Sequence, residues 1–154
     1  MKKVNTKNFK KTLSKFSTGI TVVCVKNNNS IYGKTVNSFN SLSLNPPMVL
    51  FSLGNYSSSI KQFSKTKFLS INILSSKQKK LSDNFASSTP KFENIKFIEG
   101  KNKTVIIPNC IANLECKLID KIKKGDHIIF ICKILELQSN DKLKPLLYFN
   151  SKYF

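Results

Sequence analysis

The chain has 154 residues, of which 40% are hydrophobic and 22% are charged, and its formal net charge at pH 7 is +18. This length fits one domain that spans residues 1–154, and the hydrophobic share is too high for a wholly disordered chain. No stretch reaches the roughly 18 apolar residues of a membrane-spanning helix, and the N-terminus lacks the apolar run of a secretory signal, so we expect a cytoplasmic protein without a membrane segment.

The positive charge is carried by lysine alone, because all 26 basic residues are lysine. Arginine is the residue that usually reads base edges and clamps phosphates, and the lysines are spread along the whole chain. A basic nucleic-acid-binding domain is therefore a minor alternative. A positive surface would also raise the rate of encounter with anionic cofactors.

The cysteines and the histidine show no metal-ligand spacing. Cys24, Cys110, Cys116 and Cys132 form no Cys-x-x-Cys pair, and His127 is the only histidine. Three of the cysteines have apolar neighbours, which is typical of buried thiols in a reducing compartment. We therefore expect no metal site.

Short strands and helices are predicted in the first half of the chain. Phe9, Leu13 and Phe16 recur at helical spacing after a capping Asn5 or Thr6, which predicts an amphipathic first helix. Strands are expected at residues 20–25, 31–37, 48–53 and 68–74, a turn at 27–30, and helices capped by Ser57 and Ser76.

The second half begins with a segment of poor periodicity. Residues 87–108 contain Pro90, Gly100 and Pro108, and predict a long irregular excursion of the kind that covers a site or contacts a partner. Strands are then expected at 111–122 and 127–137, joined by a turn at 123–126, and at 146–149. Many short strands and few helices favour a mainly β, antiparallel barrel over a doubly wound sheet.

Acid–base catalysis by side chains has little support in the sequence. There are eight acidic residues and one histidine, and no nucleophile elbow, Walker loop or dinucleotide fingerprint is present. Asp126 precedes His127 directly, so on a strand their side chains would point apart. This composition suits an enzyme whose cofactor carries the reaction.

Short hydroxyl and amide side chains crowd the segment that follows the second predicted strand. They are Thr35, Asn37, Ser38, Ser41 and Ser43. Such groups can hold a polar, planar cofactor and its phosphate without supplying a charge. An ordinary polar loop between two strands is the simpler alternative for this segment alone.

The order of motifs along the chain resembles the flavin reductase family. Matching pieces include Thr-Val-Asn-Ser-Phe at 35–39, Asn-Pro-Pro at 45–47, Ser-Ser-Ser at 57–59, Phe-Leu-Ser-Ile-Asn at 68–72 and Gly-Asp-His at 125–127, and the resemblance runs from about residue 9 to residue 153. It implies an FMN-binding split β-barrel, antiparallel and Greek-key-like, with a few short peripheral helices. It also implies a homodimer that reduces flavin with a nicotinamide nucleotide and supplies a partner monooxygenase.

The same resemblance implies which residues bind the two cofactors. For FMN, or FAD, they are Thr35, Val36, Asn37, Ser38, Ser41, Ser43, Ser52, Ser57, Ser59 and Asn72. For NADH or NADPH they are His127, Tyr148, Phe149 and Tyr153. No side chain is expected to be catalytic, since hydride would pass between the cofactors.

The closing segment departs from the family pattern. Ser151 stands where the family usually has glycine, and Phe149 where histidine is common. A flavin-binding electron carrier of the same fold, without NAD(P)H reductase activity, therefore stays open as an alternative. The sequence does not choose between FMN and FAD or between NADH and NADPH.

Overall fold

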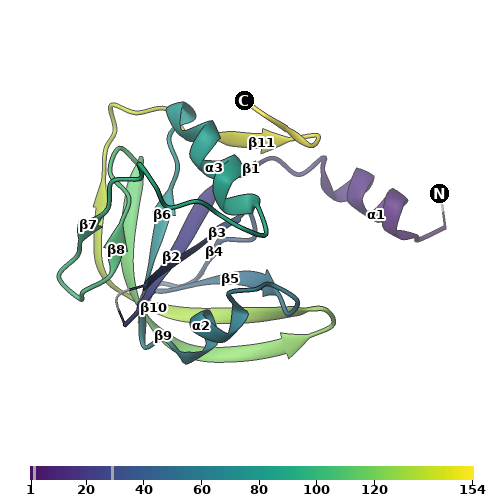
Figure 1. Ribbon diagram of the computed structural model, residues 1–154. Coiled ribbons are helices and arrows are strands. Elements are labelled where there is room, and N and C mark those ends of the chain that lie inside the picture. The colour runs from purple at the N-terminus through teal and green to yellow at the C-terminus, as the bar shows by residue number, and fades with distance from the viewer. Residues whose placement is uncertain (2, 29) are drawn as a thin grey trace.

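The computed structural model describes residues 1, 3–28 and 30–154. Its main element is a seven-stranded antiparallel sheet (Figure 1). The strands are β2 (Thr21–Asn27), β3 (Ser30–Val36), β4 (Asn40–Ser43), β5 (Met48–Gly54), β6 (Phe68–Ile73), β9 (Ala112–Lys124) and β10 (His127–Ser139). They pair in the order β3-β2-β6-β9-β10-β5-β4, and β9 and β10 form a long hairpin.

The remaining elements are short. β1 (Thr18–Gly19), β11 (Leu147–Phe149) and β12 (Lys152–Tyr153) form a small sheet, and β7 (Ile98–Glu99) pairs with β8 (Val105–Ile106). The helices are α1 (Thr6–Leu13), α2 (Ile60–Lys65), the 3₁₀ turn η1 (Ser76–Gln78) and α3 (Lys79–Ala86). The predicted mainly β, antiparallel fold with few short helices is confirmed. Within the described residues, no helix is both long and apolar enough to span a membrane.

Both faces of the central strands are buried. On β2, Val23 and Val25 join one apolar cluster, whereas Val22 and Cys24 join another, because successive side chains of a strand point to opposite faces. The first cluster includes the rings of Phe51 and Phe130, which stack with centroids 5.0 Å apart.

The second cluster is covered by α3 and by residues 87–108 (Figure 1). A Cβ added at Gly33 of β3 would lie 2.6 Å from the Phe85 ring, so α3 sits directly on β3. Phe92, Ile107 and their neighbours in 87–108 pack into the same cluster. The excursion is irregular, as expected, but most of its apolar side chains complete the core instead of covering a site.

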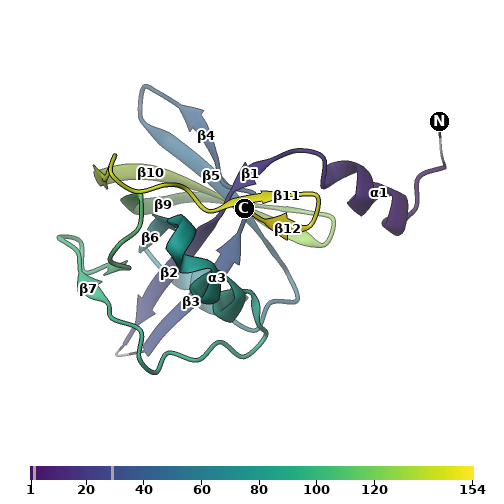
Figure 2. The same cartoon turned by 90° about the horizontal axis from the view of Figure 1, so that it is seen from above.

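Helix α1 forms as predicted, but its apolar side faces outward. The Asn5 side chain accepts a hydrogen bond from the Asn8 backbone N–H at 2.9 Å and caps the helix. Phe9, Leu13 and Phe16 are 56%, 56% and 76% exposed. Figures 1 and 2 show α1 standing away from the rest of the chain.

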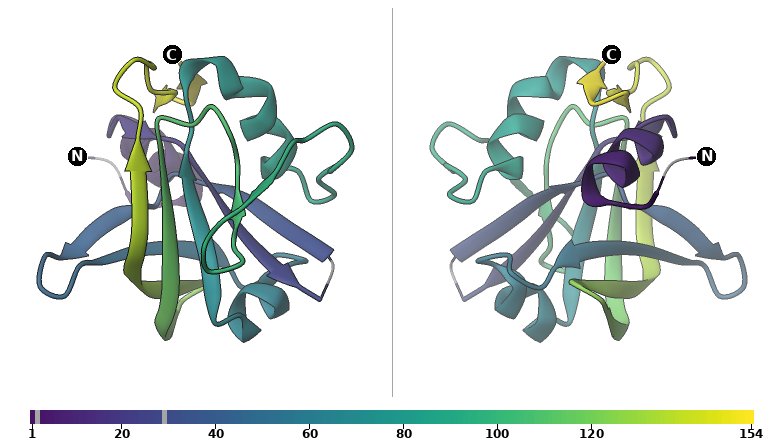
Figure 3. Two further views of the ribbon diagram at one scale, coloured as in Figure 1. Left: turned by 90° about the vertical axis from the view of Figure 1, so that its left-hand side faces the viewer. Right: turned by 90° about the vertical axis from the view of Figure 1, so that its right-hand side faces the viewer.

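Several boundaries differ from the sequence-based expectation. Ser59, not Ser57, occupies the N-cap of α2, and Ser75 with Gln78 forms a capping box that starts η1. The strand β4 was not predicted, and it pairs with β5 in a hairpin that projects from the body (Figure 3). Asn29, in the predicted turn at 27–30, lies outside the described residues.

Candidate functional site

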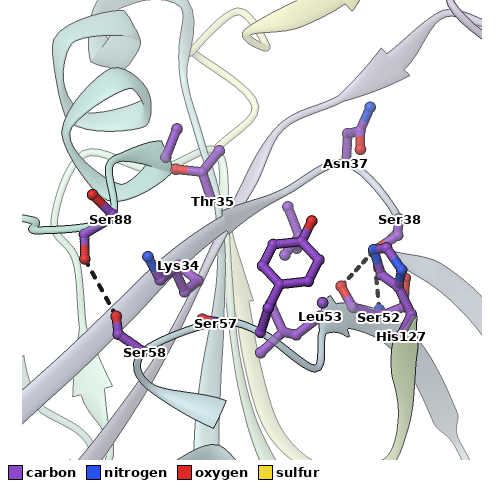
Figure 4. A pocket seen from close by; sticks show the side chains of 14 residues that line it. Lys34, Thr35, Asn37, Ser38, Ser52, Leu53, Ser57, Ser58, Ser88 and His127 are labelled. Atoms are coloured by element: carbon purple, nitrogen blue, oxygen red, sulfur yellow. Dashed lines mark hydrogen bonds between the residues drawn. The ribbon is translucent and has the colours of Figure 1, made fainter. Parts of the chain in front are cut away.

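A cavity of about 440 Å³ opens where β3 ends and β5 approaches the start of β10 (Figure 4). Six of the predicted flavin-binding residues line this cavity, which we call the hydroxyl cavity. They are Thr35, Val36, Asn37, Ser38, Ser52 and Ser57. The structure thus gathers residues from two strands and the turn after β5 in one place.

Hydrogen bonds fix the walls of the hydroxyl cavity. The Ser52 backbone N–H donates to the Ser38 hydroxyl oxygen at 2.9 Å, and that hydroxyl donates to the Ser52 carbonyl at 3.1 Å. This pair ties the end of β3 to β5 (Figure 4). The Thr35 hydroxyl donates to the Ser82 carbonyl at 2.7 Å, which ties β3 to α3.

The hydroxyl cavity contains one ammonium group and, among the described residues, no carboxylate in its lining. Lys34 donates to the Ser87 carbonyl at 2.7 Å, and burial lowers the pKa of its ammonium group. Close by, the Ser58 hydroxyl donates to the Ser88 carbonyl at 3.2 Å. This end of the cavity therefore carries a positive charge that can attract an anion.

His127 lies at the other end of the cavity, beside Ser38 and Ser52 (Figure 4). Its Nδ1 is 2.7 Å from the Asp126 carboxylate, and this hydrogen bond lowers the pKa of Asp126. The expectation that the two side chains point apart is wrong, because Asp126 lies in the turn between β9 and β10, where strand alternation does not apply. The Tyr56 ring meets the imidazole edge-on, with centroids 6.4 Å apart.

A second cavity, of about 660 Å³, adjoins the first. Residues of α1 and β1, the segment 37–40 and Tyr148 line it. Asn37 and Ser38 line both cavities, so two residues form the wall between them. Of the four predicted nicotinamide contacts, His127 lies in the hydroxyl cavity and Tyr148 in the second one.

The other two predicted nicotinamide contacts line neither cavity. The Tyr153 hydroxyl lies 2.9 Å from the Ser82 hydroxyl, and the Lys79 ammonium lies 5.1 Å from the centre of the Tyr153 ring. Phe149 lies against Lys15, whose ammonium is 5.9 Å from the ring centre. Both rings therefore brace the C-terminal hairpin.

Four predicted flavin contacts also lie away from the hydroxyl cavity. Ser41 and Ser43 are in β4, outside both cavities. Ser59 is buried behind Ser57, with the two hydroxyl oxygens 3.3 Å apart. Asn72 is fully buried, and its amide bonds the Val22 carbonyl and the Ile107 N–H, so it cannot support a ring in the cavity.

Seven residues of the cavity lining were not predicted. They are Lys34, Leu53, Gly54, Tyr56, Ser58, Ala86 and Ser88. Lys34 and Ser58 are next to predicted residues in the sequence, so their positions could have been expected near the cavity. Nothing in the sequence placed Ala86 and Ser88 near the cavity, because only the packing of α3 on β3 brings them to it. No cluster of His, Cys, Asp or Glu able to hold a metal occurs in the part of the chain that the structure describes.

The fold and the cavity together define an antiparallel β protein with a hydroxyl-lined cavity that could hold an anionic cofactor. A family model described as "Flavin reductase like domain" matches residues 13–154. The chain belongs to this flavin reductase family, which confirms the family predicted from the sequence.

Known relatives agree with this assignment. The FMN reductase (NADH) SmoA of Agrobacterium fabrum is 34% identical over 137 residues, which are 89% of this chain and 79% of that protein. The flavin-dependent monooxygenase reductase subunit HsaB of Mycobacterium tuberculosis H37Rv is 30% identical over 153 residues, covering 97% of this chain and 82% of HsaB.

Solved structures of similar proteins have the same fold. Flavin reductase PheA2 superposes with a TM-score of 0.92 at 33% identity, covering 98% of this chain and 97% of PheA2. The NADH:FAD oxidoreductase SgcE6 of Streptomyces globisporus, in complex with NAD and FAD fragments, gives a TM-score of 0.92 at 25% identity, covering 100% of this chain and 96% of SgcE6.

Proposed function

We propose that this chain is an NADH-dependent flavin reductase that supplies reduced flavin to a separate flavin-dependent monooxygenase. The observation that carries the proposal is the hydroxyl cavity, which gathers most of the predicted flavin contacts and whose described lining contains a cation but no carboxylate. Relatives named as an FMN reductase (NADH) and as reductase subunits of monooxygenases support the donor and the partner.

The donor set of the cavity fits a flavin nucleotide. When bound, the flavin ring accepts hydride from the nicotinamide nucleotide. Asn37 and Ser38 offer amide, hydroxyl and backbone N–H groups at one end of the cavity, where they would hold the ring and balance negative charge on it. Ser57 would bind the phosphate at the opposite end. FMN is the flavin that we propose, with FAD as the alternative.

The two adjoining cavities suit two ligands that must meet. Because Asn37 and Ser38 line both, a ligand in the second cavity would lie next to one in the hydroxyl cavity. His127 would bind the nicotinamide nucleotide through Nε2, since Asp126 engages its Nδ1. Tyr148 would contact the same ligand from the second cavity.

The protein would act as a homodimer in the cytoplasm. The apolar side chains of α1 are exposed in the single chain, and a second copy would cover them. The four cysteines are free, buried thiols, which suits a reducing compartment.

An absorbance titration tests the proposal. FMN is added to the purified protein, followed under anaerobic conditions by NADH or NADPH. We expect the flavin band near 450 nm to bleach at a catalytic rate, faster with NADH. A bound flavin that neither nucleotide bleaches would support the electron carrier. Failure to bind flavin, together with salt-dependent binding of DNA or RNA, would support the nucleic-acid alternative.

A further inference from the structure

A large aromatic ring lies exposed in the lining of the hydroxyl cavity. Tyr56, in the turn after β5, is 79% exposed, and the sequence-based prediction did not include it. The other large apolar side chains of the described lining, Val36 and Leu53, are almost fully buried. Tyr56 therefore offers a ligand more apolar area than either of them, and this area leaves water only when another molecule covers it.

Backbone hydrogen bonds hold the turn that carries Tyr56. The Ser57 N–H donates to the Gly54 carbonyl at 3.0 Å and closes the turn, and the Asn55 N–H donates to the Asp126 carbonyl at 2.9 Å. The second bond ties this turn to the one between β9 and β10. The base of the Tyr56 side chain is therefore fixed on two sides.

The ring itself folds back over the end of β5. A Cβ added at Gly54 would lie 2.7 Å from two atoms of the Tyr56 ring and 3.1 Å from its hydroxyl oxygen. Gly54 pairs with His127 of β10, and the rings of Tyr56 and His127 meet edge-on with centroids 6.4 Å apart. Ser52 lies two residues before Gly54 and so on the same face of β5. The Tyr56 ring is thus placed at the His127 end of the cavity.

We infer that Tyr56 forms an aromatic platform against which the conjugated ring of the flavin stacks. The inference rests on the proposed function and adds to it a contact with the ring system. Gly54 occupies one side of the phenol ring, and the rest of the ring is open to a flat ligand. Stacking suits a planar, conjugated ligand, because it depends on the overlap of two ring faces. The nicotinamide ring is the other flat ring that could lie there.

Flavin fluorescence tests this contact. A phenol that touches an excited flavin donates an electron to it, which then returns, so the emission is quenched and no product forms; a phenyl ring donates none. We expect FMN bound to the wild type, without nicotinamide nucleotide, to be darker than free FMN, and FMN bound to Tyr56→Phe to be brighter than in the wild type. By equilibrium dialysis, Tyr56→Phe should bind FMN within about 2-fold of the wild type, and Tyr56→Leu about 5- to 20-fold more weakly.

Tyr32→Phe is the matched control, because Tyr32 lies in β3 and lines neither cavity. Its bound FMN should stay as dark as in the wild type. Unchanged emission in Tyr56→Phe, or equal FMN affinity of the wild type and Tyr56→Leu, would overturn the platform and leave the proposed function intact. If Tyr56→Leu raises the KM for NADH without weakening FMN binding, the ring belongs to the nucleotide and the inference is wrong. A wild type that binds no flavin would overturn both proposals.

Gly54→Ala displaces the ring without removing it, because the added methyl group would overlap two of the ring atoms. It should weaken FMN binding in the wild type but cause no further loss when combined with Tyr56→Leu. Fully additive losses would mean that the methyl group acts on the ligand and not through the ring, which would contradict the inference. Since Tyr56 is exposed, its substitutions should leave the melting temperature close to that of the wild type.

Discussion

Neighbouring residues in the hydroxyl cavity differ in how far they also support the fold. Ser38 bridges β3 and β5 through its hydroxyl, so its substitution would disturb both the cavity and the sheet. The adjacent Asn37 side chain is exposed and lines both cavities. Asn37 is therefore the residue at which binding can be tested with the least effect on stability.

Asn37→Leu should weaken FMN binding by at least about 10-fold, because an apolar side chain replaces the amide and crowds the wall between the two cavities. The melting temperature should stay close to that of the wild type. Fluorescence titration with FMN measures the effect. Asn55→Leu, an exposed substitution in the turn after β5 and outside both cavities, is the control. Unchanged FMN affinity in Asn37→Leu would contradict the site assignment.

His127→Ala should affect the nicotinamide nucleotide more than the flavin. The loss of one hydrogen bond to the nucleotide is expected to raise the KM for NADH by about 2- to 10-fold, with the KM for FMN changed by less than about 2-fold. Steady-state kinetics with each substrate varied in turn makes the comparison. Equal changes in the two KM values would indicate that His127 only supports the structure of the turn.

At the scale of elements, a buried carboxylate organises the loop between β7 and β8. Glu115 of β9 is only 6% exposed, and it accepts hydrogen bonds from the backbone N–H groups of Lys101 and Asn102 and from the Thr104 hydroxyl, at 2.7–3.0 Å. Burial alone would raise the pKa of this carboxyl, but the hydrogen bonds outweigh burial and lower it. The ionised form therefore stabilises the fold.

Glu115→Gln should lower the free energy of unfolding by about 1.5–3 kcal/mol at pH 7. Because the folded-state pKa of Glu115 lies below its ordinary value of 4.5, the wild-type advantage is present above about pH 4.5 and is lost as the pH falls through the depressed pKa. Urea unfolding at a series of pH values measures this dependence. Glu93→Gln, at an exposed position, is the control. A difference that persists at the lowest pH would contradict the explanation.

Most strands of the main sheet could be predicted from the sequence, but only part of the candidate site could. Six of the seven strands of the main sheet follow from runs of β-branched and apolar residues, whereas β4 was not predicted. The hydroxyl-rich segment pointed to the cavity in part, because Thr35, Asn37 and Ser38 line it but Ser41 and Ser43 do not. Asn72 was predicted to contact the flavin, because the sequence does not show whether a polar residue on a strand faces a ligand or a buried hydrogen-bonding partner. Ser88 was missed because its place in the cavity depends on how α3 and the residues after it pack on β3, which involves contacts distant in sequence. Lys34 was missed although it directly precedes a predicted residue.

At the scale of the whole molecule, α1 and the residues after it carry the exposed apolar surface on which the proposed homodimer rests. Two large apolar side chains, Phe9 and Leu13, are exposed on one short helix that projects from the body, and Phe16 is exposed just after it. The same residues, Phe9, Leu13 and Phe16, line the second cavity. A second copy that covers α1 would therefore also change the shape of that cavity.

A double substitution of Phe9 and Leu13 by serine should convert a dimer to a monomer in analytical ultracentrifugation, because it removes the apolar area that drives association. It should also raise the KM for NADH. The same substitution at Lys7 and Lys11, which are exposed on this helix, should leave the dimer intact. A wild-type protein that sediments as a monomer would contradict the proposal.

Burial of both faces of the central strands raises the question of what fixes their register. A slip of one residue would only exchange one buried apolar set for the other, so the hydrophobic pattern specifies the alignment weakly. The Asn72 amide supplies the missing constraint, because it bonds the Val22 carbonyl of β2, the Asn113 amide of β9 and the Ile107 N–H at once. Any slip would leave these groups unpaired in an apolar interior. Asn72, which was expected to contact a cofactor, thus helps to fix the register of three segments of the chain.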